Sequence, residues 1–330
     1  MLVRRAVAAL VIVSGLLTLG YVGISSYIAE LLVYENPKAI VKTPASMGLR
    51  FANVTFPSRD DHVGLKGWFI PGVLPDGRLT ADRVIVAVHG LRTNRESPGD
   101  HLLQLSGELA RHGLGVLSFD MRGMGESPPA PLSMGNLEQR DVLGAVDFLR
   151  TGTLPFSELG RPRIIGGLGI SMGAATLLLA AAREPAIRAV VSDSAYADAA
   201  PLLEREIPKR TVAVVGRIPG AFAPSALLMA RVLYGVDLFD ARPVDSVARI
   251  APRPLLLIHG AADDYVPISN FQLLDAAARA PAAARVSTWV VPATRHAQAF
   301  KNTGSVYVAR VVGFFDAGLG ADRSTAGAAA

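Results

Sequence analysis

The chain has 330 residues, of which 50% are hydrophobic and 18% are charged. This balance excludes a disordered protein and predicts a large packed core. The absence of cysteine excludes disulfides, cysteine-ligated zinc and a thiol nucleophile. The formal net charge is +5, but the basic residues are scattered, without runs or interleaved aromatic residues. We therefore do not expect nucleic-acid binding.

The N-terminal segment is long and apolar. Residues 6–29 form a run of 24 residues without a charged side chain, and a bilayer core needs about 20. Arg4 and Arg5 precede the run, which predicts a cytoplasmic N-terminus and an extracytoplasmic remainder. We expect residues 1–29 to form the uncleaved signal anchor of a single-pass membrane protein. A secretory signal cleaved near Ser25 and a buried core helix are the alternatives.

After a linker over residues 30–50, the chain alternates between β-rich and helical patterns. The first two strands are separated by a short polar segment, as in an antiparallel hairpin. Later strands are separated by helices, which predicts a doubly wound, mostly parallel sheet within an α/β domain over residues 51–317. The tail 318–330 is rich in Gly, Ala and Ser and is expected to be disordered. The expected strands cover residues 51–56, 63–70, 83–88, 114–119, 163–168, 188–192, 254–258 and 286–291.

The expected helices are set by start and stop residues. The first begins at Ser97 as N-cap and stops at Gly113. The alternation is then interrupted at about residues 195–242, which contain four prolines and a mixed apolar pattern. A structureless loop of this length is improbable in a compact domain, so we expect an inserted helical cap over one edge of the sheet. The alternative is a pair of surface helices without a role. The remaining helices are expected at about residues 136–150, 172–183, 268–280 and 303–317.

A candidate nucleophile lies between a strand and a helix. The sequence Gly-Ile-Ser-Met-Gly at residues 169–173 fits G-x-S-x-G. It follows a buried strand pattern and begins an Ala/Leu-rich helix, which is the setting of a nucleophile elbow. The hydroxyl of Ser171 would then lie at a helix N-terminus, where backbone N–H groups stabilise an oxyanion. The alternative is a serine that merely caps the helix.

A serine hydroxyl needs a base. We choose His296, because it follows the last expected strand in a polar loop; a solvated loop histidine is the alternative. His89 and His259 each precede a glycine at the end of a strand and are expected to form turns near the rim. The six histidines are His62, His89, His101, His112, His259 and His296.

The third group should be a carboxylate after the strand that precedes the final helix–strand pair. Asp263 and Asp264 both lie there. Either carboxylate would orient the imidazole of the base and stabilise its cation. Asp193, after the strand that follows the nucleophile, is a rival. With any of the three, the chain order is Ser, Asp, His, the order expected for this type of fold.

Over about residues 50–317 the chain resembles the α/β-hydrolase superfamily, and is similar to its serine aminopeptidase-like and membrane-anchored esterase-like bacterial branch. The resemblance assigns the acid to Asp263, and it implies the backbone N–H groups of Leu91 and Met172 as oxyanion donors. It rests on five motifs in order: His89-Gly90, the D-x-R-G-x-G-x-S turn at 120–127, the Ser171 elbow, the H-G-x-x-D-x-x-V-P segment ending at Pro267, and His296.

The resemblance implies a serine hydrolase that acts on carboxylic (acyl) esters, with no metal or organic cofactor. The expected substrate is a small acyl ester or lipid-like molecule, and a monomer is the default. One alternative is a peptidase of the serine aminopeptidase type, for which Glu204 and Glu206 in the cap are weak candidates to bind a substrate amino group. Another is a catalytically silent, membrane-tethered binding module, which would have lost one member of the triad.

The loop after His89-Gly90 departs from the family's lipase-type form, because it has no glycine run. After His89-Gly90, Arg92 and Arg95 are expected to form a loop ion network with Glu96, or else to meet an anionic substrate. Asp120 and Arg122 are expected to pair with each other and hold their turn.

Overall fold

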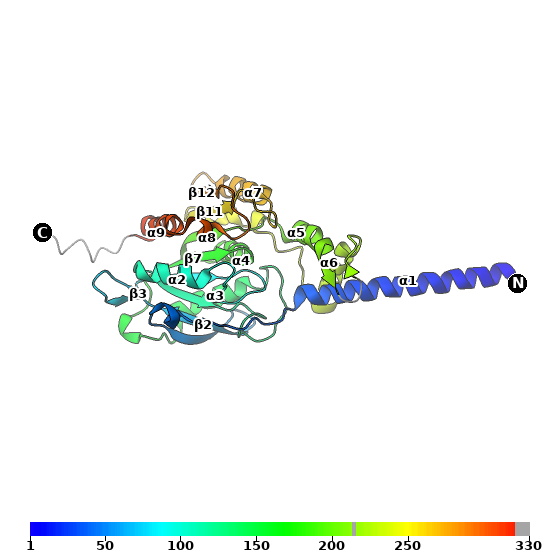
Figure 1. Ribbon diagram of the computed structural model, residues 1–330, viewed down its shortest axis with the longest axis horizontal. Coiled ribbons are helices and arrows are strands. Elements are labelled where there is room, and N and C mark those ends of the chain that lie inside the picture. The colour runs from blue at the N-terminus through cyan, green and yellow to red at the C-terminus, as the bar shows by residue number, and fades with distance from the viewer. Residues whose placement is uncertain (213–215, 321–330) are drawn as a thin grey trace.

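The computed structural model describes residues 1–212 and 216–320 (Figure 1). Most of the tail expected at 318–330 lies outside these residues. The central element is an eight-stranded sheet with the order β1-β2-β6-β5-β7-β8-β11-β12. β1 and β2 form the expected antiparallel hairpin, and the strands from β6 to β12 are parallel to one another. These strands are β1 (Ala52–Pro57), β2 (Gly64–Ile70), β5 (Arg83–Val88), β6 (Gly115–Phe119), β7 (Ile164–Ile170), β8 (Ile187–Asp193), β11 (Pro254–Gly260) and β12 (Arg285–Val291).

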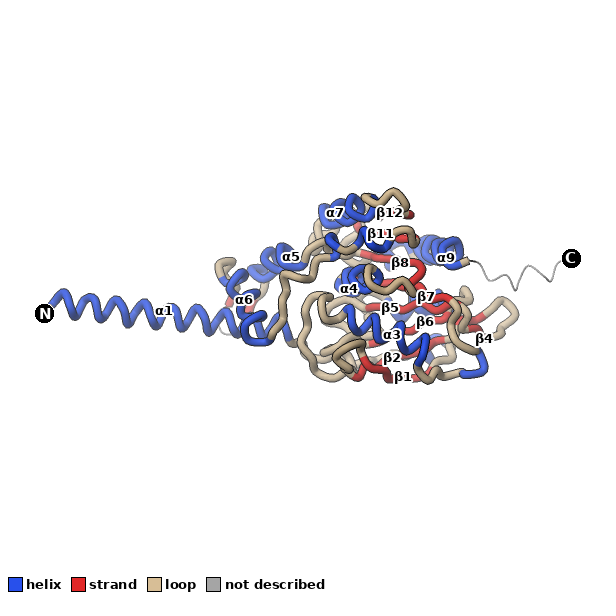
Figure 2. Tube along the Cα trace, turned by 180° about the vertical axis from the view of Figure 1, so that it is seen from behind, coloured by secondary structure: helices blue, strands red, loops and turns tan. Residues whose placement is uncertain are grey.

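Helices cover both faces of the sheet, as Figure 2 shows from behind. On one face lie α3 (Gln139–Thr151), α4 (Met172–Ala181) and α7 (Ile268–Arg279). On the other lie α2 (Leu102–Arg111), α8 (Ala299–Thr303) and α9 (Ser305–Leu319). The α/β, doubly wound, mostly parallel fold predicted from the sequence is therefore confirmed.

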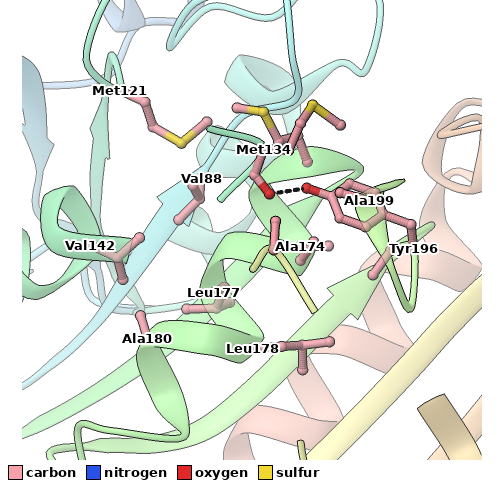
Figure 3. Packing of buried hydrophobic residues seen from close by; sticks show 14 of the residues in the cluster. Val88, Met121, Met134, Val142, Ala174, Leu177, Leu178, Ala180, Tyr196 and Ala199 are labelled. Atoms are coloured by element: carbon pink, nitrogen blue, oxygen red, sulfur yellow. Dashed lines mark hydrogen bonds between the residues drawn. The ribbon is translucent and has the colours of Figure 1, made fainter. Parts of the chain in front are cut away.

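The alternation of side chains along β5 explains the two layers. Val84, Val86 and Val88 join the cluster beneath α3 and α4, whereas Ile85 and Ala87 join the cluster beneath α2 and α9. Successive strand residues point to opposite faces, so a sheet covered on both faces has continuous apolar strands. Figure 3 shows part of the first cluster, where the buried Tyr196 hydroxyl donates a hydrogen bond to the carbonyl oxygen of Met134.

The N-terminal helix α1 (Leu2–Val33) projects far beyond the sheet (Figure 1). It continues four residues past the expected anchor boundary at Ala29. Its first two thirds expose large apolar side chains, while Ile28, Ala29 and Val33 are buried against the rest of the chain.

Between β8 and β11 the chain forms the inserted cap. It contains α5 (Ala199–Glu206), a short hairpin of β9 (Thr211–Val212) and β10 (Gly216–Arg217), and α6 (Phe222–Tyr234). The contacts hold α6 parallel to the end of α1: the Tyr21 and Phe222 rings stack with centroids 4.8 Å apart, and the Ser25 and Ser225 hydroxyls are 2.8 Å apart. A second small hairpin, β3 (Gly72–Val73) with β4 (Leu79–Thr80), was not expected from the sequence.

Two helix boundaries differ from expectation. Helix α2 starts at Leu102, because Ser97 has a left-handed backbone (φ 39°) and its hydroxyl donates to Asp100 Oδ2 at 2.8 Å, which forms a turn instead of an N-cap. The expected last helix at about 303–317 corresponds to α9, and the short helix α8 before it was not predicted; Gly304, with a φ of 48°, separates the two.

Candidate active site

Ser171 lies on the tight turn between β7 and α4. Its φ is 56°, a conformation that is strained for a non-glycine residue. Two glycines make the turn possible by close backbone approach. A Cβ on Gly169 would lie 2.4 Å from the carbonyl oxygen of Gly173, and a Cβ on Gly173 would lie 2.3 Å from that of Val88. The turn therefore presents the serine side chain above the carboxyl end of the sheet.

His296 lies in the loop after β12, and Asp263 follows β11. The Nε2 atom of His296 is 2.7 Å from Ser171 Oγ, and its Nδ1 atom is 2.7 Å from Asp263 Oδ2. The two loops approach closely because residue 260 is glycine, where a Cβ would lie 2.3 Å from the carbonyl oxygen of Thr294. The arrangement forms one hydrogen-bonded series from carboxylate to imidazole to hydroxyl.

The two neighbouring aspartates after β11 occupy different environments. Asp263 is buried, and its Oδ1 accepts hydrogen bonds from the backbone N–H groups of Tyr265 (3.0 Å) and Val266 (2.7 Å). Asp264 is exposed and pairs with Arg295 at 3.2 Å. The geometry thus separates the candidates that the residue pattern alone left open.

Asp193, the rival acid, does not contact the imidazole. It accepts hydrogen bonds from the hydroxyls of Ser194 (2.9 Å) and Tyr307 (3.0 Å). Ser194 Oγ in turn accepts from the backbone N–H of Ala297, which follows the histidine, at 3.2 Å. Burial raises the pKa of Asp193 to about 6, although both hydroxyls oppose this rise. The group therefore fixes the backbone beside His296.

The expected oxyanion donors lie next to the serine. Met172 is the first residue of α4, and Leu91 lines the same cavity as Ser171 and His296. Among the described residues, neither backbone N–H donates a hydrogen bond to another group of the chain. Their position at a helix N-terminus and beside Gly90 suits a pair of donors for one oxygen.

A cavity of about 400 Å³ opens at the serine and histidine. Its opposite wall is polar and comes largely from the cap: Glu206, Lys209 and Arg210. Glu206 is buried and accepts from Lys209 Nζ and from Arg205, each at 2.7 Å. The apolar character expected of the cap thus does not extend to the surface that faces Ser171.

The expected ion network of Arg92 and Arg95 with Glu96 is wrong. Arg95 pairs with Asp120 and Glu126, and Arg92 pairs with Glu35, while Glu96 instead accepts from the backbone N–H of Val41 at 2.7 Å. The sequence predicted pairs between neighbours within one loop. Because β5 and β6 lie side by side in the sheet, Arg95 after β5 instead pairs with residues that follow β6.

Arg122 likewise does not pair with Asp120. Its guanidinium binds Asp141 at 2.7 Å and Asp61 at 2.6 Å. These contacts connect the turn after β6 to α3 and to the β1–β2 hairpin. The role in holding the turn remains structural, but the partners come from other elements.

The other strand-end histidines are more buried than rim positions would be. His89 Nε2 accepts from the backbone N–H of Met121 at 3.1 Å, and burial lowers its pKa. His259 Nε2 is 2.9 Å from the carbonyl oxygen of Val266, and burial also lowers its pKa. Both side chains hold turns in the interior.

Several residues at the site belong to no sequence motif, so the sequence did not predict them. The ring of Tyr265 lies 4.9 Å from the His296 ring, between centroids, and covers one side of the imidazole. Arg210 and Lys209 come from an irregular part of the cap, where no local pattern marks them. Tyr307 lies on α9, more than a hundred residues from its partner Asp193. Only a three-dimensional arrangement identifies these contacts.

Comparison with known proteins agrees with this architecture. A family model described as the alpha/beta hydrolase fold matches residues 83–231. The chain is 28% identical over 258 residues to the uncharacterized protein YfhR of Salmonella typhi, covering 75% of each chain. It is 28% identical over 265 residues to YfhR of Escherichia coli K12, covering 79% of each.

Solved structures share the fold. The esterase Pf2001 of Pyrococcus furiosus matches with a TM-score of 0.67 and 21% identity, covering 87% of this chain and 100% of that one. The alpha/beta hydrolase GrgF of Penicillium sp. sh18 matches with a TM-score of 0.62 and 17% identity, covering 82% and 99%. With the sheet order and the strand–turn–helix at Ser171, these likenesses show that the chain has the alpha/beta hydrolase fold.

Proposed function

We propose that this chain is a serine hydrolase that cleaves carboxylic esters through an acyl-enzyme on Ser171. The observation that carries the proposal is the hydrogen-bonded series from Asp263 through His296 to Ser171, with both contacts at 2.7 Å. A carboxylate, an imidazole and a hydroxyl in this order are the groups that acyl transfer requires. The neighbours described as esterases share the fold, which agrees with the proposal.

The first half of the reaction makes the acyl-enzyme. His296 Nε2 takes the proton of the Ser171 hydroxyl as Oγ bonds to the ester carbonyl carbon. The backbone N–H groups of Leu91 and Met172 donate to the developing oxyanion. The imidazolium is stabilised by Asp263, and it then protonates the leaving alkoxide as the carbon–oxygen bond breaks.

The second half reverses these roles. His296 removes a proton from a water molecule, whose oxygen attacks the acyl carbon of the ester on Ser171. The tetrahedral intermediate collapses, the carboxylic acid leaves, and the proton returns to Ser171 Oγ. The partners of Asp263 Oδ1, the N–H groups of Tyr265 and Val266, hold the carboxylate in position against the imidazole during both halves.

The peptidase alternative needs a free anionic group for a substrate amino terminus. Glu204 is exposed, and Glu206 is already bound by Arg205 and Lys209. A carboxylate with two cationic partners is a poor site for a third cation, so neither cap glutamate supports the peptidase alternative.

Labelling with a fluorophosphonate probe tests the proposal directly. We expect the full-length protein in membranes to be labelled, and Ser171→Ala to lose all labelling. Ser305→Ala, an exposed serine at the start of α9, is the matched control and should label like the wild type. Folded wild-type protein that does not react with the probe would favour the silent binding module and would falsify the proposal.

We also propose that α1 anchors the enzyme, with the catalytic domain outside the cytoplasm. Large exposed apolar side chains extend from Met1 to Val22 of the described chain, and an 18-residue apolar window of α1 has no buried residue. About 20 such residues span a bilayer core. A reporter fused after Pro44 should be active only outside the cytoplasm. Activity inside would reverse the orientation, and a mature N-terminus near Ser25 would show a cleaved, secreted form.

A further inference from the structure

A second cavity, of about 530 Å³, lies between the end of α1 and the cap. Arg92 and Arg210 line both this cavity and the one at Ser171. The rest of its wall includes apolar surface from α1 and from the cap, such as Leu31 and Ile218. A ligand that fills it therefore lies beside residues that also face the catalytic serine.

Most charged side chains that line the two cavities form ion pairs, but Arg210 forms none with any described residue. Glu35 binds Arg92, and Glu206 binds Lys209 and Arg205. Within the described part of the chain, no carboxylate lies within 4.0 Å of the Arg210 guanidinium. This half-buried cation is thus left without an anionic partner at the wall that the cavities share.

The surroundings of Arg210 disfavour its charge. Burial lowers the pKa of Arg210, and the positive charge of Arg92 lowers it further, whereas Tyr265 and Glu35 oppose the change. The other acidic groups that line the cavities are engaged or in solvent: Asp100 accepts from Ser97 Oγ at 2.8 Å, and Glu30 is exposed. A bound anion would compensate a cation that the chain itself leaves uncompensated.

The second cavity also lies at the expected level of the membrane surface. The uncharged run 6–29 is about 36 Å long at 1.5 Å per residue, slightly more than a bilayer core of about 30 Å. Tyr21 of α1 stacks on Phe222 of the cap, and residues of α1 from Tyr27 onward line the cavity. Figure 1 shows α6 beside the second half of α1. A substrate with an apolar chain would reach this opening from the bilayer.

We propose that the second cavity is a subsite for an anionic group, a carboxylate or a phosphate, on the ester substrate, bound by Arg210 with Arg92 beside it. This inference rests on the proposed function and names its substrate class: esters that carry a negative charge as well as the acyl group. The apolar wall from α1 holds the adjoining chain, and the ester group extends to Ser171.

Matched soluble esters test the subsite in the full-length protein held in nanodiscs. The nitrophenyl monoester of glutaric acid carries a free carboxylate, and nitrophenyl butyrate carries none. We expect Arg210→Gln to lower the ratio of kcat/KM for the charged ester to that for the neutral one by about 10- to 100-fold, the effect of losing a charge-assisted contact. Arg210→Lys should give an intermediate ratio, because it keeps the charge without the planar fork.

Arg217→Gln is the control, because Arg217 is exposed on β10 of the same cap hairpin and lines neither cavity. It should leave the ratio unchanged. Fluorophosphonate labelling of each variant shows that its active site is assembled. An equal ratio in wild type and Arg210→Gln, with labelling intact, would overturn the subsite while leaving the proposed function in place.

A second set of substrates identifies the source of the anion. Vesicles of phosphatidylglycerol and of phosphatidylcholine present the same ester bonds with and without a net negative headgroup. Preferential loss of phosphatidylglycerol hydrolysis in Arg210→Gln supports a lipid headgroup, and loss confined to the soluble carboxylate ester supports a free anionic ester. Absence of labelling and of turnover for every ester by the wild type would refute the proposed function, and the subsite with it.

Discussion

The loops that carry Ser171, Asp263 and His296 are built differently from the wall that faces them. Each of these loops follows a strand of the central sheet and is fixed by close backbone contacts at Gly169, Gly173 or Gly260. The facing wall comes largely from the cap, at Glu206, Lys209 and Arg210, and the cap in turn packs against the end of α1.

This difference separates two tasks. The reacting groups need positions that are accurate to a fraction of an ångström, which a buried parallel sheet supplies. Under the proposed function, the facing wall would select the substrates that reach them, and its position would depend on the contact between α6 and α1. We therefore expect changes in the loops to alter the rate of the chemical step, and changes in the cap to alter substrate preference and local stability.

The largest expected effect distinguishes the two aspartates after β11. Asp263→Asn removes the carboxylate that binds Nδ1 of His296, and kcat for ester hydrolysis should fall by about 10⁴-fold. Asp264→Asn is the matched control, because this exposed residue pairs only with Arg295, and kcat should change by less than about twofold. Steady-state hydrolysis of nitrophenyl butyrate measures both. If Asp264→Asn lowered kcat more than Asp263→Asn, the triad acid would be Asp264 and not Asp263.

The next effect concerns the pH dependence of stability and comes from Asp193, whose carboxylate supports the loop of His296 but does not contact its imidazole. Burial raises the pKa of Asp193 from 3.8 to about 6, so the native state binds a proton more strongly than the unfolded state. Its contribution to stability is present at low pH and is lost as the pH rises from about 4 to about 6. The total change is about 3 kcal/mol at 1.36 kcal/mol per pKa unit.

Asp193→Asn removes this titration. The free energy of unfolding of the wild type, relative to that of the variant, should fall across the same pH interval, as measured by urea unfolding of the full-length protein in detergent at several pH values. Asn has a single acceptor oxygen, so it can keep only one of the hydrogen bonds from Ser194 and Tyr307, and the lost bond shifts the variant's curve by a constant amount. Curves that stay parallel between pH 4 and pH 7 would show that the carboxylate does not titrate there.

The sequence predicted the sheet and the candidate triad because both depend on local patterns. A buried strand followed by G-x-S-x-G requires a tight turn at Ser171, and the order of the strands places His296 and the aspartates at the same edge. Asp263 was separated from Asp264 by resemblance alone, since two adjacent acidic residues present the same local pattern. The observed hydrogen bonds of Asp263 to backbone N–H groups add the physical reason.

The charged contacts were less predictable because their partners are distant in sequence. Arg122 binds Asp61 and Asp141 from two other elements, and Arg92 binds Glu35 from the segment after α1. Nothing in a loop sequence specifies which neighbouring strand will lie beside it. For the same reason the sequence did not predict Arg210 as a residue of the cavity at Ser171, because its position depends on how the cap folds back over the sheet.

The smallest expected effect tests the docking of the cap. The Tyr21 hydroxyl donates a hydrogen bond to the carbonyl oxygen of Ala221 at 2.7 Å, and Tyr21→Phe should weaken the contact by about 1 kcal/mol. Hydrogen exchange of the α6 amides should become about fivefold faster where it proceeds through release of the cap. The amides of α4, which is buried against one face of the sheet, should not change.

Tyr34→Phe is the matched control for this measurement. Tyr34 lies at the end of the same helix and packs edge-on against Tyr234, with ring centroids 5.6 Å apart, but its hydroxyl donates no hydrogen bond to another described residue. Its removal should leave α6 exchange unaltered. Equal exchange in Tyr21→Phe and wild type would mean that the cap is held by the α/β domain and not by α1. The wall that faces Ser171 would then be as rigid as the loops that carry Ser171, Asp263 and His296.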